Sequence, residues 1–177
     1  MTETEAAALS FDINNPHIKK FIRQIQNPIL QRFFMLAKLP SAFFMGVKVQ
    51  SVNPKEAMVS IPFKWRSQNP FKSIYFAAQA AAAEMSTGVL AMLALQGRGK
   101  VSMLVTKMEG SYSKKANKLV TFTCSEGEKV IQAIQEIIQT GESREVTLLT
   151  IGTQVNDDGS IIEVSRFLFT WSFKQKK

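Results

Sequence analysis

One carboxylate stands alone in a run of small apolar side chains. Between Ala57 and Met108, Glu84 is the only acidic residue. The surrounding alanine-rich stretch predicts a helix, because alanine is the best helix former, and the near absence of charge on it is typical of a buried helix. A buried ionisable group is costly unless it is paired, hydrogen-bonded or used in chemistry. Glu84 is therefore a candidate catalytic carboxylate, and the alternative is a structural carboxylate at a dimer interface or paired with Arg66.

Helices and strands alternate around this stretch. Asn-Pro pairs at 15–16 and 27–28 predict two helix starts, with Asn as the cap and Pro at the first helical position. Alternating apolar residues predict strands, and an apolar stripe after residue 127 predicts a further helix. The predicted helices are 16–26, 28–39, 73–95 and 127–139. The predicted strands are 47–52, 57–61, 102–113, 118–124, 144–155 and 161–173, the last four paired as two consecutive hairpins.

This order of elements indicates an α+β fold. A sheet with an apolar face needs an apolar partner, and the long alanine-rich helix is the obvious filling. We find no internal repeat and no linker, so the sequence predicts a flexible tail over 1–14 and one domain over 15–177.

The charge of the chain is uneven. The formal net charge is +8; residues 98–118 hold six bases and one acid, and residues 126–163 hold eight acids and two bases. A basic segment suggests a polyanionic partner, such as a nucleotide-bearing cofactor, a nucleic acid or an acidic lipid. The alternative is a solvated surface that happens to be basic. Residues 17–45 also have two interpretations. They form either a helical flap over the core or an amphipathic membrane-surface helix.

Composition also narrows the class of protein. With 45% hydrophobic and 20% charged residues, the chain is typical of a globular protein. The single Cys124 predicts a buried, inert thiol and fits a reducing, cytoplasmic location. The acidic start of the chain lacks the pattern of a secretory signal, and the apolar stretch 33–47 is too short for a transmembrane segment. No His or Cys pair has metal-ligand spacing, and no nucleotide-binding motif or nucleic-acid-binding motif is present, so we expect no metal and no nucleic acid.

The positions around the central helix carry a family resemblance. Asn69 lies six residues before Tyr75, the triplet Tyr75-Phe76-Ala77 opens the predicted helix, and Glu84 lies nine residues after Tyr75. With its order of elements, the chain resembles the hotdog-fold acyl-CoA thioesterases of the phenylacetate-type group. That group has an Asn, then a His-Gly-Gly triplet, then an Asp or Glu nine residues after the His. The Asn and the carboxylate match, whereas Tyr-Phe-Ala stands in place of His-Gly-Gly.

The resemblance covers roughly residues 28–173 and extends to an uncharacterised thioesterase-like family of bacterial proteins. It implies a hotdog fold, in which a curved antiparallel sheet wraps a long central helix. It also implies a homodimer, or a dimer of dimers, joined edge to edge along the sheets. The substrate implied is an acyl-CoA or acyl-carrier thioester, so coenzyme A would enter as part of the substrate rather than as a cofactor.

The resemblance implies roles in thioester hydrolysis for the matching residues. Glu84 would act as general base or nucleophile, and the free N–H groups near Phe76 and Ala77 would receive the oxyanion. Asn69 would orient water or the thioester, or is simply a turn residue before Pro70. The remaining candidates are Ser86 and Thr87 beside the carboxylate, Tyr75 at the helix start (or as a packing residue), and Arg98, Lys100, Lys114, Lys115 and Lys118 as phosphate contacts.

The sequence therefore favours an acyl-CoA thioesterase. A non-catalytic acyl-thioester or fatty-acid binding module on the same fold is the alternative, because the His-Gly-Gly triplet is missing. A third alternative is a basic protein that associates with membrane or nucleic acid. A hydratase is disfavoured, because the only histidine, His17, precedes the sheet.

Overall fold

The N-terminal helices begin where the Asn-Pro pairs predict. In the computed structural model, which describes residues 11–176, the Asn15 side chain accepts from the backbone N–H of His17 and starts α2 (Pro16–Gln26). The Asn27 side chain likewise caps α3 (Pro28–Lys38). The second predicted helix is divided, because Pro40 opens a separate short helix, α4 (Pro40–Met45). Most of the predicted tail, residues 1–10, lies outside the described residues.

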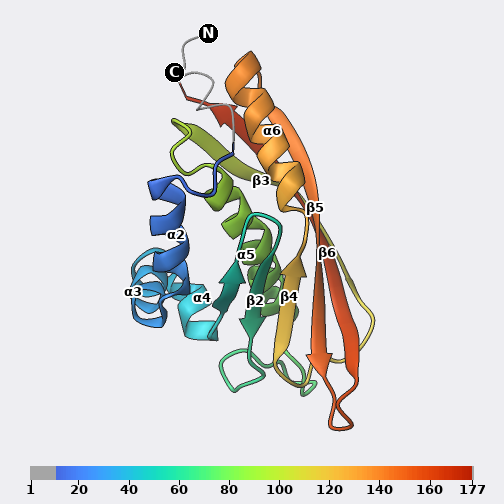
Figure 1. Cartoon of the computed structure of the whole chain (residues 1–177). Helices are drawn as coiled ribbons and strands as arrows, with labels where there is room; N and C mark the ends of the chain where they lie inside the picture. Colours follow the sequence, from blue (N-terminus) through green and yellow to red (C-terminus); the bar gives the residue numbers. More distant parts are fainter. Residues whose placement is uncertain (1–10, 177) are drawn as a thin grey trace.

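The strands form one antiparallel sheet (Figure 1). Its order is β1-β2-β4-β5-β6-β3, so β1 and β3 are the two edges. The bounds are Lys48–Val52 for β1, Ala57–Ile61 for β2, Val101–Tyr112 for β3, Val120–Cys124 for β4, Arg144–Val155 for β5 and Ile161–Gln175 for β6.

The predicted hairpin between 102–113 and 118–124 is wrong. β3 pairs with β6, with Val101 opposite Gln175 and Tyr112 opposite Ser165, whereas β4 lies between β2 and β5. Burial explains the separation, since alternate residues of β4 are fully buried and β3 is exposed along most of its length. Proximity in the sequence does not determine which strands share a core face. The second predicted hairpin, β5 with β6, is confirmed.

The alanine-rich segment forms the central helix. Helix α5 (Phe76–Ala94) packs against β2, β4 and β5 inside the curved sheet (Figure 1). It begins three residues later than predicted, because the backbone N–H of Ile74 donates to Ala116 and that of Tyr75 donates to Ser67. Among the described residues, α5 alone is long and apolar enough to cross a membrane, but 67% of that stretch is buried in the fold.

The core lies between α5 and the sheet. The alternating aromatic residues of β6 all face inward: Phe167 and Phe173 are fully buried, and Phe169 and Trp171 nearly so. The remaining helix, α6 (Gly127–Thr140), packs against β5, β6 and α5. The observed architecture confirms the expected α+β hotdog fold.

Candidate active site

Glu84 lies at a small apolar cavity. The cavity has a volume of about 160 Å³, and the side chains that line it come from α2, α3, α5, β1, β3 and β6, including Phe34, Met103 and Trp171. Burial raises the pKa of the Glu84 carboxyl above its usual value. Within the described residues, the carboxylate has no ion pair and no hydrogen bond, so the alternative pairing with Arg66 is not seen. An unpaired carboxylate beside an apolar cavity is a stronger base than one in water.

The close approach of Trp171 to the helix fixes the surroundings of this carboxylate. A Cβ at Gly88 would lie 3.3 Å from the Trp171 ring and 3.5 Å from Glu84 Oε1. A side chain at position 88 would therefore be tightly packed between the indole and the carboxylate, and glycine leaves room for both on this side of α5. The Trp171 indole N–H donates to the Thr87 hydroxyl at 2.9 Å, which holds the ring in place.

The two hydroxyl candidates near Glu84 have other partners. The Thr87 hydroxyl donates to the Glu84 backbone carbonyl at 2.8 Å while it accepts from Trp171. The Ser86 hydroxyl hydrogen-bonds the Ala83 carbonyl and the Thr150 hydroxyl. Both side chains are fully buried. As the structure places them, these hydroxyls position the helix and the indole rather than contact the carboxylate.

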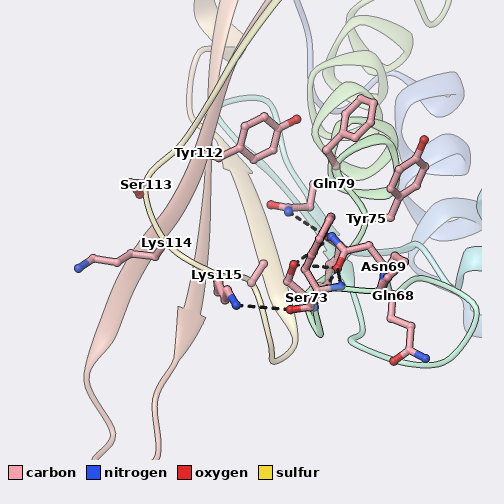
Figure 2. Close-up of a pocket in the computed structure, with 14 residues that line it drawn as sticks. Gln68, Asn69, Ser73, Tyr75, Gln79, Tyr112, Ser113, Lys114 and Lys115 are labelled. Atoms are coloured by element: carbon pink, nitrogen blue, oxygen red, sulfur yellow. Dashed lines mark hydrogen bonds between the residues drawn. The ribbon is translucent and has the colours of Figure 1, made fainter.

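A larger cavity opens at the start of α5 (Figure 2). Its volume is about 820 Å³, and its walls are the 68–76 loop, the first turn of α5 and residues 112–116. Asn69 lines this cavity, but its amide is engaged by its own loop. The side-chain oxygen accepts from the backbone N–H groups of Phe71 and Ser73, and the amide nitrogen donates to the Ser73 hydroxyl at 3.0 Å. This is the turn role expected of Asn in a loop.

The first N–H groups of α5 face no partner within the described part of the chain. Tyr75 is the N-cap residue without a side-chain cap, and neither Phe76 nor Ala77 donates its backbone N–H to another described residue. Such unpaired donors at the positive end of a helix dipole favour an anion. The Tyr75 and Phe76 rings are about half exposed and pack edge to face.

The five basic candidates fall into two groups. Lys114 and Lys115 line the large cavity, and the Lys115 ammonium donates to the Phe71 carbonyl at 3.5 Å. Lys118 lies nearby in the chain but forms an ion pair with Asp157. Arg98 and Lys100 follow the opposite end of α5, so the structure does not bring them to this cavity. The Arg98 guanidinium is buried over the Phe11 ring, and burial lowers its pKa.

Sequence reasoning missed several polar residues of the large cavity, of which Gln79 and Tyr112 lie on opposite walls. Gln79 is buried one turn into α5; its amide accepts from the Ser165 hydroxyl at 2.9 Å and donates to the Ile74 carbonyl. Tyr112 ends β3 with its ring edge to face on Phe167, and Figure 2 shows it pointing across the cavity from the opposite wall. The only signal in the sequence was that Gln79 is the one amide in an alanine run.

The prediction of a buried thiol is confirmed. Cys124 is buried, and burial raises the pKa of its thiol to about 11, which makes it a poor nucleophile. Among the described residues, no group of three or more His, Cys, Asp or Glu side chains could hold a metal ion.

A family match and structural likenesses place this architecture among known proteins. The sequence model of a family described as "Domain of unknown function (DUF4442)" matches residues 29–171. The chain belongs to the DUF4442 family. No curated protein matches the chain significantly.

Three solved structures show the same fold at low sequence identity. A Chlorobaculum tepidum protein of unknown function has a TM-score of 0.69 at 14% identity, over 90% of this chain and 94% of that one. A thioesterase family protein from Silicibacter pomeroyi has a TM-score of 0.62 at 10% identity, over 84% and 98%. A thioesterase from Haemophilus influenzae has a TM-score of 0.55 at 10% identity, over 81% and 88%. At sequence identities this low, the structural likeness establishes only the fold, which is the hotdog fold.

Proposed function

We propose that this DUF4442 protein hydrolyses acyl-CoA or acyl-carrier thioesters. The observation that carries the proposal is the Glu84 carboxylate, which is unpaired within the described residues and desolvated beside an apolar cavity. A carboxylate in such a place destabilises the fold, and its use in catalysis accounts for its presence. Structural neighbours named as thioesterases support the same reaction class.

The proposed reaction uses two parts of α5, the Glu84 carboxylate and the free N–H groups at the start of the helix. Glu84 takes a proton from water as the water oxygen adds to the thioester carbonyl carbon. In the alternative route the carboxylate adds to that carbon directly, and water then hydrolyses the acyl-Glu84 anhydride that is left when the thiolate departs. The carbonyl oxygen becomes an oxyanion, which the N–H groups of Phe76 and Ala77 stabilise. The C–S bond then breaks and the thiolate leaves. It takes up the proton that water gives up, either to Glu84 in the first route or during hydrolysis of the anhydride in the second. In this proposal Lys114 and Lys115 bind the phosphates of a pantetheine carrier, which their position in the wall of the large cavity supports.

The distance along α5 between the two groups favours a site that two copies of the chain complete. Phe76 and Glu84 are eight residues apart on α5, which at 1.5 Å per residue separates them by about 12 Å along the helix axis. One thioester carbonyl cannot contact both groups of the same chain. A second copy supplies the missing partner if its α5 lies antiparallel beside the first.

The exposed edge of the sheet offers a place for that second copy. β3 is a 12-residue edge strand that carries the exposed side chains Leu104 and Met108. A long unpaired edge with apolar residues is a template for pairing with another chain. Pairing of β3 with β3 of a second copy would produce a symmetric homodimer with two composite sites.

The alternative function, binding of acyl thioesters without hydrolysis, is supported by the residues at the start of α5. Asn69 is engaged by its own loop, and the bulky side chain of Phe76 stands where a smaller residue would leave the donors more open. If the chain binds acyl thioesters without turnover, the large cavity and the Glu84 cavity would still hold them.

The test is hydrolysis of a panel of short-, medium-, long-chain and aryl acyl-CoAs, with release of free thiol as the measurement. We expect Glu84→Gln to lose at least about a hundredfold in turnover, a scale typical of acid–base groups. The exposed carboxylate Glu145 on β5 supplies the matched control, Glu145→Gln, which should keep wild-type turnover. A wild-type protein that binds members of the panel but hydrolyses none would establish the binding module instead.

A further inference from the structure

The outer face of α3 is unusual because its exposed side is its apolar side. Ile29, Phe33 and Leu36 recur at the spacing of one helix face, and all three are more than half exposed. The side turned to the protein carries Gln31 and Met35, and the Gln31 amide donates to the Val49 carbonyl at 2.9 Å. A surface helix ordinarily shows the reverse arrangement.

Aromatic residues extend this apolar face beyond α3. On α4, the exposed Phe44 ring packs edge to face on Trp65, with the centroids 6.3 Å apart. Trp65 belongs to the loop between β2 and α5 and is 79% exposed. A groove of about 250 Å³ between α3 and α4 is lined by the apolar residues of the face together with Arg32. Exposed apolar patches of this kind mark sites of protein or membrane interaction.

A basic pocket adjoins the groove and favours an anionic membrane over a protein as the partner. It has a volume of about 300 Å³, shares Pro28, Arg32 and Phe43 with the groove, and is also lined by Lys48 and Arg66. No acidic side chain lines either cavity. From residue 13 to residue 83 the chain has ten basic residues and a single acid, Glu56, so this segment alone carries an excess of nine positive charges.

We propose that this face docks on an anionic lipid bilayer, with apolar side chains in the interface and lipid phosphate in the basic pocket. The face consists of α3, α4 and Trp65. Aromatic and aliphatic side chains beside basic ones are the composition that binds membrane interfaces, and anionic headgroups attract Lys and Arg close to the surface. The sequence offered a membrane-surface helix over 17–45 as an alternative, and the structure narrows it: α2 turns Ile18, Phe21 and Ile25 into the core. The proposal does not depend on thioester hydrolysis.

Vesicle binding tests the proposal with the intact protein. We expect it to co-sediment with vesicles of phosphatidylcholine and phosphatidylglycerol, far more weakly with phosphatidylcholine alone, and less as salt rises. Trp65 provides a local probe, because the other tryptophan, Trp171, is buried. Its fluorescence should shift to the blue on binding and be quenched by brominated acyl chains. Failure to bind anionic vesicles, or equal binding to neutral ones, would overturn the proposal.

Two sets of variants localise the binding. Phe33→Ser with Leu36→Ser should weaken vesicle binding about tenfold or more, whereas Val155→Ser with Ile161→Ser, at exposed sites on β5 and β6, should not. Arg32→Gln, Lys48→Gln and Arg66→Gln together should weaken it about a hundredfold, at about fivefold for each charge. The charge-matched control is Lys107→Gln, Lys174→Gln and Lys176→Gln.

The sedimentation mass distinguishes a bilayer from a second copy of the chain. If the face were an interface between copies, Phe33→Ser with Leu36→Ser would lower the mass of the assembly, and the wild type would not bind vesicles. That result would contradict the proposal. Circular dichroism establishes that each variant is folded before its binding is compared.

Discussion

At the scale of single residues, the account depends on the unpaired carboxylate of Glu84. The structure surrounds it with apolar side chains and with Gly88, whose missing side chain leaves room for the Trp171 ring. Glu84 was predictable from sequence, because one charge in an alanine run is visible without coordinates. The partners of Ser86 and Thr87 were not, because Thr150 and Trp171 come from strands more than 60 residues away.

The desolvated carboxylate gives stability a definite dependence on pH. The folded protein raises the pKa of Glu84 above its unfolded value, so the native state binds the proton more tightly and loses stability as pH rises through that range. Glu84→Gln should therefore raise the melting temperature at pH 8 and leave it nearly unchanged at about pH 4, below the usual glutamate pKa. Thermal melts of both proteins at the two pH values measure this. A variant less stable than wild type at pH 8 would show that the carboxylate is structurally satisfied.

Gly88 offers a test of how the carboxylate is positioned. The methyl group of Gly88→Ala would press on the Trp171 ring and lie against Glu84 Oε1. Alanine favours the helix by about 1 kcal/mol, and overpacking costs about 1–3 kcal/mol, so the net change in stability should be small. We expect turnover to fall about tenfold or more through a lower kcat, with the fold intact by circular dichroism. Unchanged kcat would mean that the carboxylate tolerates displacement.

At the scale of elements, the sequence predicts the pieces better than their pairing. Every helix except α4 and every strand lies close to its predicted position, because periodicity and the Asn-Pro caps are local signals. The β3–β4 hairpin was wrong because alternation does not identify a partner strand. The late start of α5 was missed for a similar reason, since Ile74 and Tyr75 are held by remote backbone groups.

The docking of α6 on the turn after β1 gives a prediction at this scale. The N–H of Gly127 donates to the Lys55 carbonyl at 3.0 Å, and a Cβ at Gly127 would lie 2.1 Å from the Pro54 carbonyl oxygen. Gly127→Ala should therefore cost about 2 kcal/mol or more in the free energy of unfolding. Urea denaturation measures it, with the exposed Gln132→Ala on the same helix as a control expected within about 0.5 kcal/mol of wild type. Equal stability of the two variants would contradict this packing.

At the scale of the whole molecule, one chain holds the two halves of the proposed site too far apart to act on one carbonyl. The carboxylate lies midway along α5, the free N–H groups lie at its start, and the exposed edge strand β3 is available to a second copy.

Phe76→Pro removes one proposed donor while sparing the helix. Proline is favoured at the first helical position, and Tyr75 already has the extended backbone, with ψ at 137°, that a following proline requires. We expect about a hundredfold loss of turnover, typical of one missing oxyanion donor. Circular dichroism and the melting temperature provide the control for folding. Retained turnover would exclude the Phe76 N–H as a donor.

Mixing two inactive variants tests the central claim most directly. Glu84→Gln and Phe76→Pro are unfolded together, refolded in equal amounts, and assayed for acyl-CoA hydrolysis beside each variant alone. Random pairing makes half of the dimers mixed, and each mixed dimer has one intact composite site, so about a quarter of wild-type turnover should return. If the mixture is no more active than its components, the carboxylate and the donors do not meet across two copies, and the proposed composite site is wrong.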